Sequence, residues 1–178
     1  MKNSFIGAGN IASAIIGGIT KDNFIKKEDI SIFDVNKEVF KKYKDDGFDA
    51  KENIEEVFLS DVIFLTVKPQ FYKDVLSKMK NLKGKIIVTV APGITIKRVA
   101  DAIDGSNKII RTMPNTPLMV GEGMTVMAKA DNVTNEDFDF VKGLFEKSGR
   151  VEVIKEELID ATIAVASSSP AYIFMMIE

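Results

Sequence analysis

A glycine-rich turn near the amino terminus constrains the fold of this chain most. The segment 7–12 has the pattern Gly-x-Gly-x-x-Ala and stands directly between a strand-like run, 3–6, and a helix-like stretch, 10–19. In such a turn the first glycine permits the tight bend, the second lets the backbone approach a pyrophosphate, and the small third residue allows close packing of helix on strand. The first N–H groups of the helix then face the phosphates. The pattern alone would fit an unliganded surface turn, but in this position it indicates a dinucleotide-binding site.

Strand-like and helix-like stretches alternate along the rest of the first 155 residues. Further strands are expected at 29–33, 61–67, 85–90, 108–113, 125–128 and 151–154. Helices are expected at 37–44, 71–79 and 95–103, and after Thr134, which is a candidate N-cap. Short connections between alternating strands and helices favour a mostly parallel sheet with right-handed crossovers. We therefore predict an α/β, Rossmann-like dinucleotide-binding domain over residues 1–155.

The pattern changes after Glu156. The stretches 158–165 and 171–178 are apolar on nearly all sides of a helix, and Ser167-Ser168-Ser169-Pro170 interrupts them. A helix that is apolar all round must be buried against something. We expect residues 156–178 to begin a second, helical domain whose remainder lies outside this sequence.

The residue inventory excludes several kinds of chemistry. The chain has neither His nor Cys, which removes Ser-His-Asp and Cys-His nucleophilic machinery, an imidazole acid or base, and Cys-ligated metals. With 24 basic and 26 acidic residues, and with lysines scattered along the chain, nothing favours a nucleic-acid or membrane partner. We predict a small-molecule substrate and no metal. Because no basic leader and no run of about 18 apolar residues is visible, we also expect a cytoplasmic protein.

Asp34 is the acidic residue expected at the end of the second strand. There a carboxylate can accept hydrogen bonds from the adenosine ribose hydroxyls, although an Asp in that place is also an ordinary turn residue. A 2′-phosphate would bring about −1.5 to −2 charges into the same space. Lys37, three residues on, would attract that phosphate. We interpret the balance as favouring NADH over NADPH.

Five motifs are highly specific when they are taken together. They are Gly7-Ala8-Gly9-Asn10, Val67-Lys68-Pro69-Gln70, Met113-Pro114-Asn115-Thr116-Pro117, Gly121-Glu122-Gly123-Met124 and Ser168-Ser169-Pro170-Ala171-Tyr172. In their order and spacing the chain resembles the pyrroline-5-carboxylate reductases. The resemblance implies an NAD(P)H-dependent oxidoreductase that reduces the cyclic imine Δ1-pyrroline-5-carboxylate to L-proline, the last step of proline biosynthesis. It also implies a homo-oligomer held together by a C-terminal, all-α dimerisation domain.

By the same resemblance, the cofactor-binding residues gather in a few short segments. The turn that would hold the pyrophosphate comprises Gly7, Ala8, Gly9, Asn10, Ile11 and Ala12. Asn53 would lie on the adenosine side, and Asn115 would border the nicotinamide pocket. The residues that would approach the ribose and nicotinamide are Val67, Lys68, Pro69, Ala91 and Gly93. Lys68 also fits a strand end with a solvated amine. Catalytic and substrate-binding residues stay unassigned, because the family's substrate-gripping loop lies beyond this stretch of sequence.

Three positions depart from the family's usual pattern. Ser167 and Pro92 stand where Gly and Ala are usual, and Asp34 stands where NADPH-preferring members carry a small polar residue. Ser167 and Pro92 leave open a nucleotide-binding regulatory paralogue without turnover. The other alternative is a β-hydroxyacid-dehydrogenase-like oxidoreductase, but that group carries a catalytic Lys on its inter-domain helix. No Lys occurs between Glu156 and Glu178.

Overall fold

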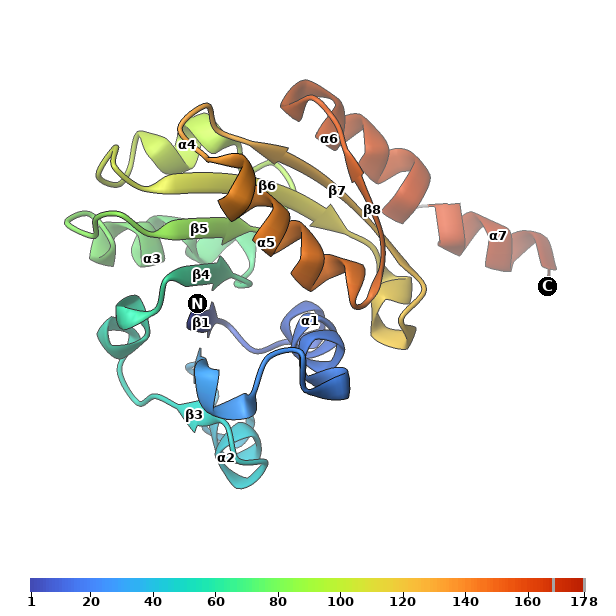
Figure 1. Cartoon of the computed structure of the whole chain (residues 1–178). Helices are drawn as coiled ribbons and strands as arrows, with labels where there is room; N and C mark the ends of the chain where they lie inside the picture. Colours follow the sequence, from blue (N-terminus) through green and yellow to red (C-terminus); the bar gives the residue numbers. More distant parts are fainter. Residues whose placement is uncertain (168, 178) are drawn as a thin grey trace.

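An eight-stranded sheet in the order β3-β2-β1-β4-β5-β6-β7-β8 runs through the computed structural model, which describes residues 1–167 and 169–177 (Figure 1). The strands are β1 (Asn3–Ile6), β2 (Ile30–Phe33), β3 (Asp49–Ala50), β4 (Val62–Leu65), β5 (Ile86–Thr89), β6 (Lys108–Pro114), β7 (Gly123–Lys129) and β8 (Gly149–Val153). Only the β6–β7 pair is antiparallel among the described strands. The order from β3 to β6 is that of a doubly wound dinucleotide-binding sheet, which confirms the predicted fold class. Strand order reverses between β1 and β4, where such sheets bind ligands.

The strands lie within a few residues of their predicted ranges, with three differences. The two-residue β3 is too short to leave an alternating pattern. β6 continues through Pro114, which the sequence suggests as a terminator, and Pro114 pairs with Thr125 of β7. A proline is tolerated at such a strand end because only its N–H is missing from the ladder. β7 is antiparallel because the connection 115–122 is shorter than the dozen or so residues that a parallel crossover needs.

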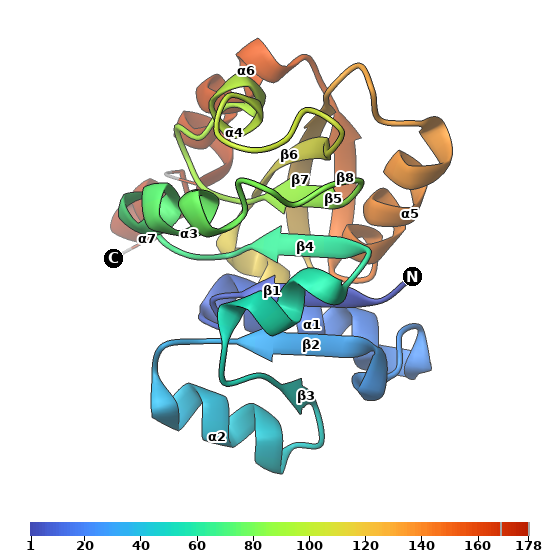
Figure 2. The same ribbon diagram turned by 90° about the vertical axis from the view of Figure 1, so that its left-hand side faces the viewer.

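Helices cover both faces of the sheet, with α1 and α5 on one face and α3, α4 and α6 on the other (Figure 2). The α-helices are α1 (Asn10–Thr20), α2 (Lys37–Asp45), α3 (Tyr72–Lys78), α4 (Ile96–Ala100), α5 (Asn135–Glu146), α6 (Glu156–Thr162) and α7 (Ser169–Ile177). Shorter 3-10 turns are η1 (Lys21–Asn23), η2 (Lys27–Asp29), η3 (Ile54–Leu59), η4 (Pro69–Phe71) and η5 (Thr116–Val120), and η6 (Ile163–Ser167) is π-helical. The central strands are therefore apolar on both faces, as parallel strands between two helical layers must be. Phe5 and Phe64 stack at 4.5 Å beneath α1 and α5, whereas Ile6 and Ile63 belong to the opposite core.

Three helices begin with the side-chain caps that their sequences provide. Thr134 accepts a hydrogen bond from the N–H of Asp137 at 3.2 Å, which confirms it as the N-cap of α5. Asn36 and Thr95 cap α2 and α4 in the same way. By contrast, α1 has Gly9 as its N-cap residue and no side-chain cap. The first N–H groups of α1 are thus the ones left for another acceptor.

The chain after β8 forms α6, η6 and α7, and Figure 1 shows α7 extending away from the sheet. The predicted interruption at 167–170 is wrong in one respect, because α7 already begins at Ser169. Pro170 therefore lies in the first turn of that helix, where its missing N–H costs no hydrogen bond. Ser168 of the same motif lies outside the described residues.

The helices after β8 differ in how they meet the sheet. α6 buries Ile159 against Val126 and Ala128 of β7. In α7, the side chains of residues 172–177 are 52–82% exposed although all are large and apolar. None of the described helices is both long and apolar enough to cross a membrane.

Candidate functional site

The two glycines of the amino-terminal turn, Gly7 and Gly9, have different structural roles. Gly7 has a φ of +91°, and a Cβ built on it would lie 2.9 Å from Cγ1 of Val67 and 3.0 Å from the carbonyl oxygen of Thr66. Gly7 is thus required by the fold itself, because both its conformation and its packing exclude a side chain. Gly9 has a φ of −73°, and a Cβ built there meets nothing within 4 Å. The fold does not need a glycine at position 9, so its missing side chain keeps open a space in front of α1.

That space is suited to an anion. The first turn of α1 has neither a side-chain cap nor an acidic residue, so its N–H groups and the positive end of the helix dipole face the opening. Ala12 is 1% exposed and packs α1 closely onto the sheet, as the small third residue of the pattern should. Two observations that do not depend on the motif therefore indicate that the turn can hold a pyrophosphate. They are the open cradle at Gly9 and the uncapped N–H groups behind it.

Asp34 links this turn to the end of β2. Its Oδ2 accepts the N–H of Ala8 at 2.7 Å, and its Oδ1 accepts the N–H of Asn36 at 2.8 Å. A carboxylate has about four lone-pair sites, so each oxygen can still accept a hydroxyl proton. Asp34 is consequently both a clamp on the glycine turn and an available acceptor for a ribose.

A cleft of about 580 Å³ opens at the carboxyl ends of β1, β2 and β4, where strand order reverses. Its size is in the usual range for a small-molecule site, and its walls are mostly apolar with a few polar groups. The cleft is lined by Ile6, Gly7, Gly9, Phe33, Asp34, Val35, Asn36, Ile54, Thr66, Val67, Lys68, Phe71, Asp74, Val75 and Lys78. The glycine turn, Asp34 and the segment after β4 lie far apart in the sequence, and all three line this one cleft.

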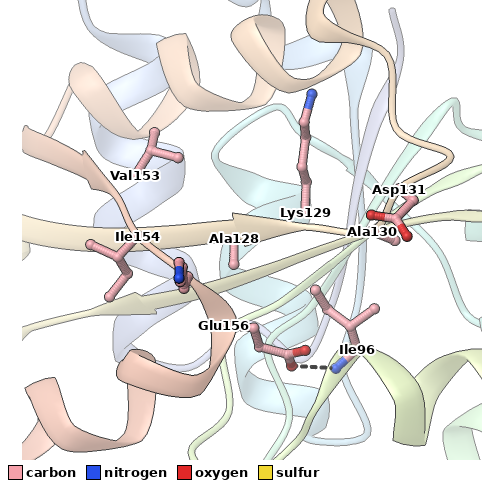
Figure 3. Close-up of a pocket in the computed structure, with 9 residues that line it drawn as sticks. Ile96, Ala128, Lys129, Ala130, Asp131, Val153, Ile154 and Glu156 are labelled. Atoms are coloured by element: carbon pink, nitrogen blue, oxygen red, sulfur yellow. Dashed lines mark hydrogen bonds between the residues drawn. The ribbon is translucent and has the colours of Figure 1, made fainter.

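A second hollow, of about 420 Å³, lies beside the start of α6 and away from the glycine turn (Figure 3). There the Glu156 carboxylate accepts the N–H of Ile96 at 2.7 Å. Glu156 also pairs with the buried Arg111 of β6. This hollow lies at the junction of α4, β7, β8 and α6, and none of the predicted cofactor residues lines it.

Four more of the predicted site residues are close in sequence to residues that line the cleft. Asn10 and Ile11 begin α1, and Pro69 begins η4 directly after the cleft residue Lys68. Asn53 immediately precedes η3, where its side-chain Nδ2 donates to Oε1 of Glu56 at 3.1 Å. Asn53 is not itself a lining residue, although its neighbour Ile54 is.

Ala91, Gly93 and Asn115 do not line this cleft. Ala91 is 4% exposed, and Gly93 makes a turn with a φ of +70°. Asn115 accepts the N–H of Met124 at 2.9 Å and donates to the carbonyl of Ala166 at 3.3 Å. Asn115 thereby connects the β6–β7 loop to η6. A contact between these three residues and a nicotinamide stays a prediction.

The sequence also contained a signal for cleft residues that were not predicted. Phe71, Asp74, Val75 and Lys78 line the cleft from η4 and α3. Their spacing of three, four and seven residues is that of one helix face. Since this helix follows Val67–Pro69 directly, its cleft-facing side could have been predicted from the position of the motif.

Comparisons with known proteins identify the family of this chain. Residues 2–93, which include the glycine turn, Asp34 and Lys68, match the family model described as NADP oxidoreductase, coenzyme F420-dependent. The pyrroline-5-carboxylate reductase of Escherichia coli (strain K12) is 38% identical over 99% of this chain and 67% of its own length. The chain belongs to the pyrroline-5-carboxylate reductase family. The family and the nicotinamide-dependent oxidoreductase class that the motifs predict are both confirmed.

Solved structures lead to the same family. The pyrroline-5-carboxylate reductase of Coxiella burnetii superimposes with a TM-score of 0.93 at 25% identity, over 98% of this chain and 67% of that one. The Plasmodium falciparum pyrroline carboxylate reductase, solved with NADP bound, gives a TM-score of 0.88 at 31% identity, over 99% and 66%. The chain thus spans about two thirds of the length of these relatives. The predicted β-hydroxyacid-dehydrogenase alternative finds no support in them.

Proposed function

We propose that this chain is the cofactor-binding part of an enzyme that reduces Δ1-pyrroline-5-carboxylate to L-proline with NADH or NADPH. The observation that carries the proposal is the open cradle at Gly9, which joins the uncapped start of α1 to the cleft at the switch point of the sheet. In this proposal, residues 1–155 bind the dinucleotide. Residues 156–178 begin a helical domain that supplies substrate contacts.

The residue inventory suits this reaction. A bound reduced nicotinamide supplies a hydride, and a protonated cyclic imine is already an electrophile that needs no strong general acid. The protein must mainly bind and orient the two partners. In our proposal the turn 7–12 holds the pyrophosphate and Asp34 accepts a ribose hydroxyl. Val67–Pro69, Ala91, Gly93 and Asn115 flank the nicotinamide.

The exposed face of α7 supports the proposed homo-oligomer. Soluble domains rarely leave a large contiguous apolar patch uncovered, and residues 172–177 present such a patch. We propose that further helices of the same protein, and those of a second copy, cover it. Sedimentation of the full-length protein should then give a dimer or a larger assembly. We expect the enzyme to draw on the nicotinamide pool of the cytoplasm.

The function is tested by adding Δ1-pyrroline-5-carboxylate to the full-length protein with NADH or NADPH. We expect the nicotinamide absorbance to fall and proline to appear in equal amounts. Binding of the dinucleotide without its oxidation would instead support the regulatory paralogue. No binding at all would overturn the site assignment.

A further inference from the structure

A buried hydroxyl lies beneath the segments proposed to flank the nicotinamide. It belongs to Tyr72, the first residue of α3, which is 1% exposed. The hydroxyl oxygen lies 2.7 Å from the carbonyl oxygen of Leu65 and 2.8 Å from Oγ1 of Thr89. Because a carbonyl can only accept, Tyr72 donates to Leu65, and Thr89 must donate to Tyr72. The ends of β4 and β5 are thus joined through one phenol.

Other hydroxyls extend this connection to the neighbouring strands. Oγ1 of Thr112, on β6, donates to the carbonyl of Thr89 at 3.0 Å. Oγ1 of Thr66, just after β4, donates to the carbonyl of Gly7 at 2.5 Å. We call Thr66, Tyr72, Thr89 and Thr112 the strand-end brace. It crosses the carboxyl ends of β1, β4, β5 and β6 with uncharged groups only.

The brace is placed where it can set the geometry of the site. Leu65 stands two residues before Val67, and Thr89 stands two residues before Ala91. A single hydroxyl therefore has contacts at the bases of both segments.

The Tyr72 hydroxyl stays protonated and serves as a hydrogen-bond donor, not as a proton source. Burial raises the pKa of Tyr72 to about 12, and the hydrogen bond from Thr89 opposes this rise only in part. At neutral pH the group is therefore fully protonated, and it keeps its proton directed at Leu65.

We propose that Tyr72 is a positioning residue that fixes the separation of the Val67–Pro69 and Ala91–Gly93 segments, and so prepares the nicotinamide side of the site. The inference rests on the proposed function, because it assumes that these segments flank the nicotinamide. Without the hydroxyl, the carbonyl of Leu65 and Oγ1 of Thr89 lose a buried partner, and the two segments can shift independently.

The test compares two ligands on the full-length protein. NADH carries the nicotinamide, whereas ADP-ribose offers only the adenosine, the pyrophosphate and a ribose. Tyr72→Phe keeps the ring and removes only the hydroxyl. We expect calorimetry to show NADH binding weakened by about five- to tenfold, and ADP-ribose binding changed by less than about twofold. In the absence of ligand, hydrogen exchange of the amides at Val67, Lys68, Ala91 and Gly93 should accelerate.

Matched variants separate positioning from general damage. Thr89→Val should reproduce the NADH defect, whereas Thr89→Ser, which keeps the hydroxyl, should restore it. Tyr43→Phe is the control, because the Tyr43 hydroxyl bonds to Ser13 at 2.7 Å, between α2 and α1 and away from both segments. We expect Tyr43→Phe to leave the ratio of NADH to ADP-ribose affinity unchanged. If Tyr72→Phe does not fold, Thr89→Val gives the same comparison.

The outcomes distinguish the inference from the proposed function. If wild type binds NADH but Tyr72→Phe weakens both ligands equally, or neither, the positioning role is wrong and the function stands. If wild type binds neither NADH nor NADPH, the proposed function falls and the positioning role falls with it.

Discussion

Two polar clusters of this molecule differ in charge and in what they connect. The strand-end brace joins strands of one sheet, and Tyr72, Thr89 and Thr112 are each at most 1% exposed. The second cluster, which we call the α6 anchor, consists of Arg111, Glu156 and Asp160. The Arg111 guanidinium on β6 is 2% exposed, and it lies 3.3 Å from Oε1 of Glu156 and 2.5 Å from Oδ1 of Asp160. The uncharged cluster lies at the edge of the sheet that we propose binds the cofactor, and the charged one fastens α6 to the sheet.

The two clusters differ in exposure because hydroxyls and charged groups differ in the cost of their burial. Hydroxyls can be buried completely at low cost once each is hydrogen-bonded, and such bonds are insensitive to salt. A buried guanidinium needs carboxylates around it, and here those side chains stay 31% and 53% exposed. Charge pairs that reach the solvent are screened by salt. The geometry of the proposed cofactor edge should therefore be insensitive to salt, whereas the attachment of α6 should weaken as the salt concentration rises.

The largest effect is expected at the α6 anchor. Arg111→Met keeps the length of the side chain but leaves Glu156 and Asp160 without their cation. We expect a loss of about 3 kcal/mol in the free energy of unfolding, at the lower end of the range for broken buried pairs because the carboxylates are partly hydrated. Urea denaturation measures it. Dinucleotide affinity should not change, since the anchor does not line the cleft.

Arg98→Met on α4 is the matched control for this substitution. Arg98 is exposed, so its replacement should alter stability by less than about 0.5 kcal/mol. A loss at Arg111 no larger than at Arg98, or a parallel loss of NADH binding, would remove the distinction between the two clusters.

The second prediction concerns how stability depends on pH, which tests the burial of Tyr72 in the strand-end brace. Burial raises the pKa of Tyr72 from its ordinary value of 10.0 to about 12 in the folded state. A raised pKa stabilises the fold fully below pH 10 and loses that stabilisation as the pH rises toward 12. The difference corresponds to at most about 2.7 kcal/mol. We expect the free energy of unfolding of wild type to approach that of Tyr72→Phe over this window, in parallel urea titrations. Curves that stay parallel from pH 9 to pH 12 would show that the phenol is not buried as described.

The third prediction separates cofactor binding from stability within the glycine turn. A Cβ at position 9 meets nothing within 4 Å, so Gly9→Val places a branched side chain in the open cradle. Dinucleotide affinity should fall at least about tenfold, which is about 1.4 kcal/mol, while the melting temperature stays close to wild type. Gly7→Ala should lower the melting temperature before it affects dinucleotide affinity. At position 7 the φ is +91°, and an added Cβ would be in close contact with Val67. Calorimetric titration and thermal melts of both variants measure the contrast. Unchanged affinity in Gly9→Val would contradict a pyrophosphate at this turn.

Local patterns explain which features the sequence could predict. The glycine turn, Asp34 at the end of β2 and the Thr134 cap each depend on neighbouring residues, so they were visible. The brace and the anchor were not, because they join residues far apart in sequence. Thr89 meets Tyr72 only through the register of parallel strands, and the partners of Arg111 are 45 and 49 residues away. A lone Arg inside the apolar strand 108–113 was the available signal for the anchor, since a buried guanidinium requires carboxylates.

The smallest effect concerns the choice between NADH and NADPH, and it depends on Asp34. The carboxylate lines the cleft, and a 2′-phosphate there would add about −1.5 to −2 charges beside it. Two unit charges 4 Å apart repel by about 1 kcal/mol in water and about 4 kcal/mol at an effective dielectric of ~20. Since this edge is open to solvent, we expect about 1 kcal/mol, a several-fold preference for NADH. The ratio of kcat/KM for the two cofactors in the full-length enzyme measures it.

Two variants separate the charge of Asp34 from its role as a clamp on the glycine turn. Asp34→Asn removes the charge and can keep an acceptor for the N–H of Ala8, whereas Asp34→Ser removes the charge and is too short to hold both N–H groups at their present distances. Both should shift the ratio toward NADPH by a similar factor. Only Asp34→Ser should also weaken NADH, because it frees the turn from β2. A wild type that already prefers NADPH, or a ratio that neither variant moves, would show that Asp34 clamps the turn without selecting the cofactor.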